Sequence, residues 1–176
     1  MNNKGLKNGY LELLDYQDNY PKIYEKEKNN LLSIYKDKIR NIEHVGSTNI
    51  KNIKSKPIID IMIETDDLNN FINFTESNVV GENYTVRKES TTPDYLIRRV
   101  EKDIVKAYIH IYQTGDINAK RLILFRDYLN NNEDEKKKYE KLKLDLYNKY
   151  KNDRNNYVLG KVDYIKNLIE KIEKSL

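Results

Sequence analysis

The sequence contains no cysteine and no tryptophan, and only two of its 176 residues are histidines. The absence of cysteine excludes disulfides, thiolate zinc sites and thiol nucleophiles. A metal ion would therefore be held by carboxylates, imidazoles or the phosphate oxygens of a ligand. Long apolar runs are also missing, since none approaches the ~20 residues that span a membrane. The polar segment Met1–Gly9 lacks the apolar core of a signal peptide, so we expect no membrane association and a cytoplasmic location.

Charge of one sign is not in strong excess. The 32 basic and 28 acidic residues leave a net charge of +4, which is small for a protein that binds nucleic acid through its phosphates. RNA binding through the basic helices stays a weak alternative, because the basic residues alternate with acidic ones. The composition indicates at most a mild preference for anions, and the length is typical of one domain covering residues 1–176.

The hydrophobic pattern predicts an α+β fold. Asp18, Asn19 and Pro21 mark the start of a helix that ends near Lys38. Short β-rich runs follow at 42–46 and 58–64, then a short helix after Asp67, and three alternating runs at 84–88, 95–100 and 104–112. Helical spacing returns over 122–129, 139–150 and 162–176, with 153–157 and Gly160 separating the last two helices. We predict a small mixed sheet with one helix before it and several after it.

One segment has the residue types that a chemical site needs. Gly46-Ser47-Thr48 follows a strand, and a glycine–serine turn there can offer backbone N–H groups and a hydroxyl to a phosphate. Asp60 lies inside the apolar strand that comes next, where a carboxylate can bind a divalent cation bridging to that phosphate. Two simpler interpretations stay open: an ordinary turn, and an ion pair between Asp60 and a basic residue such as Lys56.

The strand that carries Asp60 offers no second acidic ligand nearby. Strand alternation places Asp60, Met62 and Glu64 on one face. Glu64 is about 13 Å from Asp60 at ~3.3 Å per residue, so the two carboxylates cannot share a metal. The intermediate position is Met62, which has no metal-binding oxygen.

Both histidines fall in predicted strands close to this segment. His44 and His110 could bind phosphate, ligate a metal together with Asp60, or act as acid and base near neutral pH, and either could instead be structural. Lys56 and Arg126 are further candidates for binding an anion. Arg126 could equally form an ion pair on its own helix, since Asp127 is its neighbour.

The run from His44-Val45-Gly46-Ser47-Thr48 to Lys56-Pro57-Ile58-Ile59-Asp60 resembles the signature of the GrpB family, which reads roughly H-x-G-S-T-S, a spacer, then K-P-I-I-D. Other segments resemble the family's conserved motifs in the same order along nearly the whole chain. These segments are Leu14–Glu27, Ile109–Ile111, Phe125–Leu129, Tyr139–Lys143 and Tyr157–Lys161.

The resemblance implies a bacterial protein of the nucleotidyltransferase superfamily, with that superfamily's α+β core. In it, Gly46 and Ser47 would contact the phosphates of a nucleoside triphosphate, and Asp60 would bind Mg²⁺ or Mn²⁺. Thr48, Lys56 and Arg126 are our further candidates for binding the nucleotide. His110 and His44 are our candidates for catalysis together with Asp60. The reaction would transfer a nucleotidyl group to a hydroxyl of a small-molecule or macromolecular acceptor.

The chain departs from the superfamily and family patterns in two places, and the first of these, at Met62, supports a different function. Active transferases usually have a second acidic residue where Met62 stands, and a third on a later strand, where His110 would stand. The loop Asn49–Ile53 also replaces the family's usual S-V-P-G-L. The alternative is a non-catalytic module that binds a nucleotide or a phosphometabolite and has a degenerate metal site.

Overall fold

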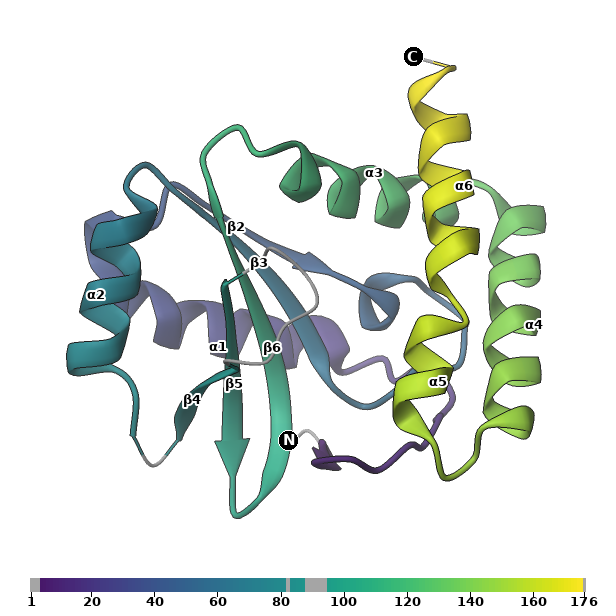
Figure 1. Cartoon of the computed structure of the whole chain (residues 1–176), viewed down its shortest axis with the longest axis horizontal. Helices are drawn as coiled ribbons and strands as arrows, with labels where there is room; N and C mark the ends of the chain where they lie inside the picture. Colours follow the sequence, from purple (N-terminus) through teal and green to yellow (C-terminus); the bar gives the residue numbers. More distant parts are fainter. Residues whose placement is uncertain (1–3, 82, 88–94, 176) are drawn as a thin grey trace.

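A mixed sheet forms the centre of the computed structural model, which describes residues 4–81, 83–87 and 95–175 (Figure 1). Its strands are β1 (Leu6–Lys7), β2 (Asn41–Val45), β3 (Ile59–Thr65), β4 (Tyr84–Arg87), β5 (Tyr95–Glu101) and β6 (Ile104–Gln113). The strand order is β2-β3-β6-β5-β4, and β1 pairs with β6. Only β3 and β6 run parallel among the described strand pairs. The predicted α+β class with a mixed sheet is confirmed.

Six α-helices surround the described part of the sheet. They are α1 (Tyr20–Tyr35), α2 (Leu68–Asn78), α3 (Ile117–Asn131), α4 (Glu133–Lys149), α5 (Arg154–Leu159) and α6 (Val162–Glu173). Short 3₁₀ turns follow α1 at Lys36–Lys38 and β2 at Ser47–Asn49. Side chains of Asp67, Asp116, Asn132 and Asp153 accept backbone N–H groups at the starts of α2, α3, α4 and α5, which satisfies donors that a helix leaves unpaired.

Most predicted elements are present, with two corrections. The segment around Asp153–Tyr157 was expected to separate two helices, but Asp153 caps the additional helix α5 within it. The strand β1 near the N-terminus was not predicted, since two residues carry no readable alternation. The predicted strand end at Lys88 lies outside the described residues. No helix in the described ranges is long and apolar enough to span a membrane.

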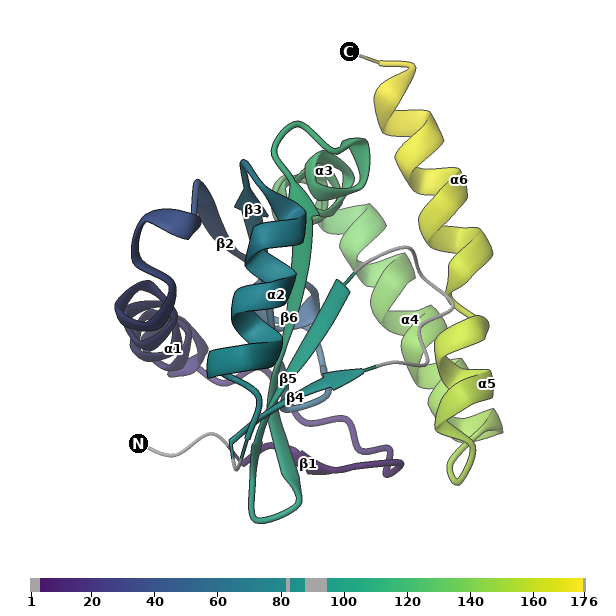
Figure 2. The same cartoon turned by 60° about the vertical axis from the view of Figure 1, so that its left-hand side comes forward.

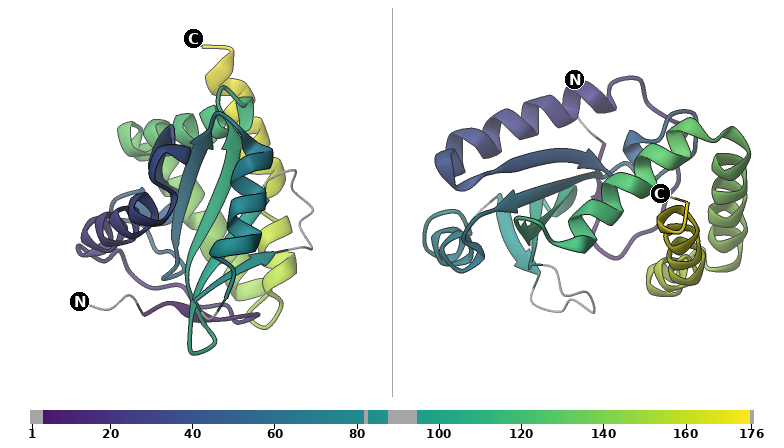
Figure 3. Two further views of the ribbon diagram at one scale, coloured as in Figure 1. Left: turned by 90° about the vertical axis from the view of Figure 1, so that its left-hand side faces the viewer. Right: turned by 90° about the horizontal axis from the view of Figure 1, so that it is seen from above.

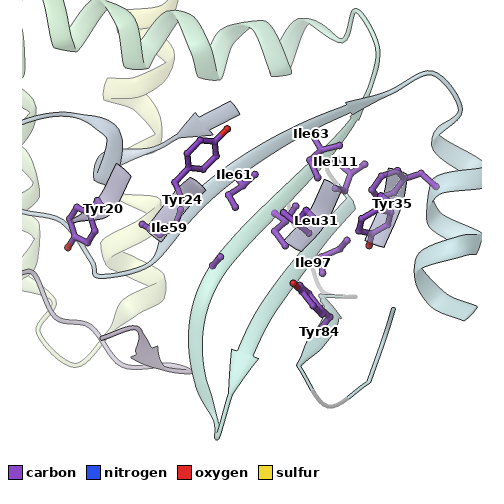
Figure 4. Packing of buried hydrophobic residues seen from close by; sticks show 13 residues of the cluster. Tyr20, Tyr24, Leu31, Tyr35, Ile59, Ile61, Ile63, Tyr84, Ile97 and Ile111 are labelled. Atoms are coloured by element: carbon purple, nitrogen blue, oxygen red, sulfur yellow. The ribbon is translucent and has the colours of Figure 1, made fainter. Parts of the chain in front are cut away.

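One face of the sheet carries the main hydrophobic core. Ile59, Ile61 and Ile63 of β3 pack there against α1 and α2, together with Tyr20 and Tyr35. Figure 4 shows these side chains gathered on one side of the strands. The β-branched residues suit a central strand whose face is fully covered. The opposite face of β3, which carries Asp60 and Met62, is turned toward the C-terminal half of the chain.

Helix α3 covers only part of that opposite face. Val45, Met62 and Ala119 form a small core beneath it. Seen from above, α1 and α3 lie on opposite sides of the sheet, and α4, α5 and α6 stand together beyond one end of it (Figure 3, right). Residues of α3, α4 and α6 share a separate core with Ile50 and Ile53 of the β2–β3 connection. Figure 2 shows α4, α5 and α6 to one side of the sheet. Arg154 of α5 contacts Tyr108, the register partner of Asp60, so α5 lies near the Asp60 end of the face.

Candidate functional site

The turn after β2 lies directly on Asp60. Gly46 has φ 72° and ψ −174°, a backbone conformation that is almost restricted to glycine. A β-carbon at this position would be 2.3 Å from Oδ2 of Asp60. The sequence therefore needs glycine here for two reasons, and the Ser47–Asn49 turn is held beside the carboxylate.

Asp60 is the acidic centre of this face, with 30% of its side chain exposed. It pairs in register with Val45 on one side and with Tyr108 on the other, and Arg98 continues the same row across the sheet. Nε2 of His110 lies 3.8 Å from Oδ1 of Asp60. A partner was expected for a carboxylate inside an apolar strand. The imidazole of His110 is close enough to serve as this partner, and nearby lysines also interact with the charge of Asp60.

Three cations near Asp60 form what we call the basic cluster. Lys56 and Lys161 interact with the charge of Asp60, and Arg154 interacts with both lysines. Burial, together with the charges of Lys161 and Arg154, lowers the pKa of Lys56 to about 7, although the charge of Asp60 opposes the shift. Burial also lowers the pKa of Lys161 to about 8, again against the attraction of Asp60. The positive charges outnumber the carboxylate, so an anion would relieve their mutual repulsion.

Tyr108 joins the basic cluster to the sheet. Nη2 of Arg154 donates a hydrogen bond to the Tyr108 hydroxyl, and the guanidinium carbon lies 5.6 Å from the centre of its ring. Nζ of Lys56 lies 5.9 Å from the centre of the same ring. A tyrosine between two cations holds them in place through its electron-rich faces.

A cleft of about 690 Å³ opens beside the basic cluster, between β4–β6 and helix α5, and we call it the α5 cleft. Its lining includes basic, amide and apolar side chains. They belong to Asn8, Val86, Arg87, Arg98, Tyr108, Arg154, Asn155, Val158 and Leu159. Arg154 belongs to both features, so the α5 cleft and the basic cluster are continuous.

The connection from the glycine turn to Lys56 is held by α3 and α4. The backbone N–H of Lys54 donates to Oε1 of Glu140 at 2.8 Å, and Nζ of Lys143 donates to the Lys54 carbonyl. Lys143 is 1% exposed, and its burial lowers its pKa to about 7. The hydroxyls of Ser47 and Tyr139 approach to 3.5 Å. The C-terminal helices therefore position the loop that carries Lys56.

The two histidines lie on opposite faces of the sheet. His110 pairs with Met62 and shares the face of Asp60, whereas His44 pairs with Ile61 and turns toward α1. The His44 ring stacks on Tyr24 at 4.8 Å, and its Nε2 is 2.9 Å from Oγ1 of Thr48. Burial lowers the pKa of His44 to about 4, so this ring is neutral at pH 7 and holds the turn through Thr48.

Arg126 contacts the strand that precedes the turn. Its Nη1 donates to Oε2 of Glu43 at 2.8 Å and to the His44 carbonyl at 2.9 Å, and its Nε donates to Asp127. The arginine thereby fixes α3 on β2. The structure brings Asp60, His110, Lys56, Gly46 and Ser47 together. His44 supports the turn through Thr48 from the α1 side of the sheet, whereas Arg126 of α3 holds the preceding strand β2.

The donor atoms near Asp60 can be compared with the needs of a magnesium ion. No group of three or more histidine and carboxylate side chains that could hold a metal occurs within the ranges that the structure describes. Met62 is fully buried beneath α3, so the usual position of a second carboxylate does not face the site. Mg²⁺ is often bound by one carboxylate, water and the phosphates of a ligand. Asp60 fits a cation that arrives with a polyphosphate.

Arg154 and Tyr108 were not recognised from the sequence as site residues, and neither was Lys161. The only signal for Lys161 was its place in the segment Tyr157–Lys161. Arg154 lies in no recognisable motif. Its position against the sheet depends on helix α5, which the sequence pattern did not predict.

The fold and the site define an α+β protein in which a glycine–serine turn, a strand carboxylate and a basic cluster meet on one face of a mixed sheet. Comparison with known proteins agrees with this class. The chain belongs to the GrpB family, since the family described as GrpB protein matches residues 10–171.

The relatives cover most of the chain. A glutamate-rich protein GrpB of Alkalihalophilus pseudofirmus is 28% identical over 172 residues, covering 96% of this chain and 99% of that protein. A UPF0157 protein of Halalkalibacterium halodurans is 31% identical over 141 residues, covering 79% of this chain and 70% of that protein. The UPF0157 protein YqkA of Bacillus subtilis is 29% identical over 164 residues, but the match covers 93% of this chain and only 48% of YqkA.

A solved structure supports the architecture. The crystal structure of the conserved protein GrpB from Enterococcus faecalis superposes with a TM-score of 0.81 at 25% identity, covering 93% of this chain and 98% of that one.

Proposed function

We propose that the protein binds a nucleoside triphosphate, with the polyphosphate between the Gly46–Ser47 turn and the basic cluster. The observation that supports this most is the excess of positive charge around one carboxylate. Among the residues that the structure describes, Lys56 interacts with the charges of Lys161, Arg154 and Arg87, but with one acidic group, Asp60. Phosphate oxygens would neutralise these cations and form charge-assisted hydrogen bonds with them.

A divalent cation enters this proposal with the nucleotide. Asp60 would supply the one protein ligand to Mg²⁺ or Mn²⁺, and water and phosphate oxygens would supply the others. The cation would neutralise part of the charge that Asp60 and the polyphosphate bring together. His110, 3.8 Å from Asp60, would keep the carboxylate oriented toward the turn.

The same site would accommodate transfer of a nucleotidyl group to an acceptor hydroxyl on a small molecule or a macromolecule. The hydroxyl oxygen would attack the α-phosphorus, its proton would pass to the Asp60–His110 pair, and pyrophosphate would leave with the electrons of the broken P–O bond. The buried Met62 favours the alternative, a binding module without catalysis, because standard two-metal transfer uses a second carboxylate there.

Calorimetric titration of ATP, with and without Mg²⁺, tests the binding proposal. Arg154→Gln should weaken binding about tenfold, because it removes one charge-assisted contact with phosphate. Arg121→Gln is the matched control, since Arg121 also lies on a helix but pairs with Glu173 away from the cleft. Arg154→Gln also removes the contact with Tyr108 and could therefore disturb the fold. Lys161→Met is the second variant, because it removes a cation of the same cluster without touching that contact. Wild-type protein that binds no nucleotide, or variants that bind it equally well, would overturn the proposal.

Pyrophosphate release separates an enzyme from a binding module. The purified protein is incubated with each nucleoside triphosphate, Mg²⁺ and a panel of sugars, alcohols, nucleosides and short RNAs. Release that depends on an acceptor and is lost in Asp60→Asn would support transfer. Nucleotide binding without release from any acceptor would support the module. RNA binding that does not weaken as salt increases would exclude a phosphate-driven RNA site.

A further inference from the structure

Helix α5 presents apolar side chains to a cleft whose other wall is basic. Val158 and Leu159 are 40% and 60% exposed, and both line the α5 cleft. Facing them across the cleft are Arg87 of the edge strand β4 and Arg98 of the adjacent strand β5. One wall is thus suited to an apolar surface and the other to negative charge or to a flat polar group.

The α5 cleft is continuous with the basic cluster through Arg154. This residue contacts Tyr108 at the sheet and influences the pKa of both Lys56 and Lys161. A ligand whose phosphates bind the basic cluster would therefore extend along α5 toward Val158 and Leu159. The volume of about 690 Å³ lies within the range of small-molecule sites and exceeds what a triphosphate alone would fill.

We propose that the α5 cleft holds the nucleoside part of the triphosphate, with the base lying against Val158 and Leu159. A nucleobase has a flat apolar face for these side chains, and arginine guanidinium groups such as that of Arg98 stack on such rings. The amides of Asn8 and Asn155 in the cleft lining can donate to and accept from the ring edge or the sugar. This inference rests on the proposed function and adds the position and the chemical class of the rest of the ligand.

Inorganic tripolyphosphate tests the inference, because it has the phosphates of a nucleotide without the nucleoside. Its affinity is compared with that of ATP, GTP, CTP and UTP in wild type, Leu159→Asn and Leu32→Asn. At least one nucleotide should bind about tenfold more tightly than tripolyphosphate, because the base buries apolar surface of the cleft that tripolyphosphate leaves exposed. Leu159→Asn should remove most of that difference without changing tripolyphosphate binding. Leu32, an exposed leucine on α1, is the control and should change neither.

The outcomes distinguish this inference from the proposed function. Equal affinities of tripolyphosphate and every nucleotide would overturn the nucleoside site and leave the phosphate site intact. Nucleotide binding that weakens in Leu159→Asn, in a protein that does not bind tripolyphosphate, would support the nucleoside site in the α5 cleft but contradict the phosphate site. Absence of binding by all these ligands would overturn both. A dimer that dissociates in Leu159→Asn, with unchanged nucleotide affinity, would show that a second copy covers α5 and would also overturn the inference.

Discussion

Gly46 and Asp60 are so close that a β-carbon on Gly46 would stand 2.3 Å from the carboxylate oxygen Oδ2. The proximity results from the tight turn after β2, which crosses the neighbouring strand β3 at the position of Asp60. Backbone and carboxylate thus meet without an intervening side chain. A phosphate bound at the turn would lie next to Asp60, so its charge would have to be balanced by the basic cluster or by a cation.

Gly46→Ala should lower the free energy of unfolding by about 2–4 kcal/mol, because it adds both backbone strain and a clash. The measurement is urea unfolding followed by circular dichroism. Gly115→Ala is the matched control: Gly115 also has a positive φ of 86°, but nothing lies within 4 Å of its missing β-carbon. That variant should lose only about 1 kcal/mol from strain. Equal losses in the two variants would contradict the close contact with Asp60.

His44 should make the protein less stable as the pH falls from about 6.5 to about 4. Burial lowers the pKa of His44 from its ordinary 6.5 to about 4, so in this interval the unfolded chain binds a proton that the folded chain does not. The loss is complete below pH 4 and absent above pH 6.5. It should reach about 3 kcal/mol, as the free energy of unfolding measured by urea titration.

Two variants isolate this effect from the titration of carboxylates. His44→Gln removes the ionisable ring and should show a smaller decrease in stability between pH 6.5 and 4. His110→Gln removes the other histidine, which lies on the opposite face of the sheet, and should retain the full decrease. A decrease that persists in His44→Gln would show that the ring is not the group responsible.

Nucleotide binding should be accompanied by proton uptake at pH 8.5. In the free protein the pKa of Lys56 is about 7 and that of Lys161 about 8, so both are mostly neutral at this pH. Bound phosphates favour the charged forms, and uptake of roughly one to two protons is expected. Affinity should consequently fall as the pH rises from 7.5 to 9.5. Calorimetry in two buffers with different ionisation enthalpies measures the uptake directly.

Lys56→Met should reduce the proton uptake by about one, since it removes one of the two titrating groups. Lys120→Met, at an exposed lysine on α3, should leave it unchanged. Uptake that is the same in Lys56→Met and wild type would mean that the phosphates do not reach the basic cluster.

The local pattern predicted most of the fold because every element except β1 and α5 carries its own signal. Pro21 marks the first turn of α1, and the isoleucines from Ile59 onward define a covered central strand. The site could be predicted only where a motif marked it, as for Gly46, Ser47 and Asp60. Which face a strand residue uses depends on the register, and this is why His44 and His110 are separated by the sheet.

Arg154 and Tyr108 show why the remainder of the site was hidden. They are 46 residues apart in the chain, and their contact exists only because α5 returns to the sheet. Neither residue belongs to a spacing pattern that indicates anion binding. Long-range packing of this kind is decided by the cores that α3, α4 and α6 share, which sequence periodicity does not specify.

Asp60→Asn should have opposite effects on nucleotide binding with and without magnesium. Without Mg²⁺, the substitution removes a negative charge beside the phosphates, so ATP should bind more tightly by about 1 kcal/mol, roughly fivefold. With Mg²⁺, the protein would lose the carboxylate ligand that we propose for the cation, so MgATP should bind more weakly than it does to wild type. Glu64→Gln is the control, because Glu64 is on the same strand face but pairs with Asn41 and Gly115 instead. Tighter binding in both conditions would show that Asp60 repels the ligand and holds no cation, and the basic cluster alone would then account for nucleotide binding.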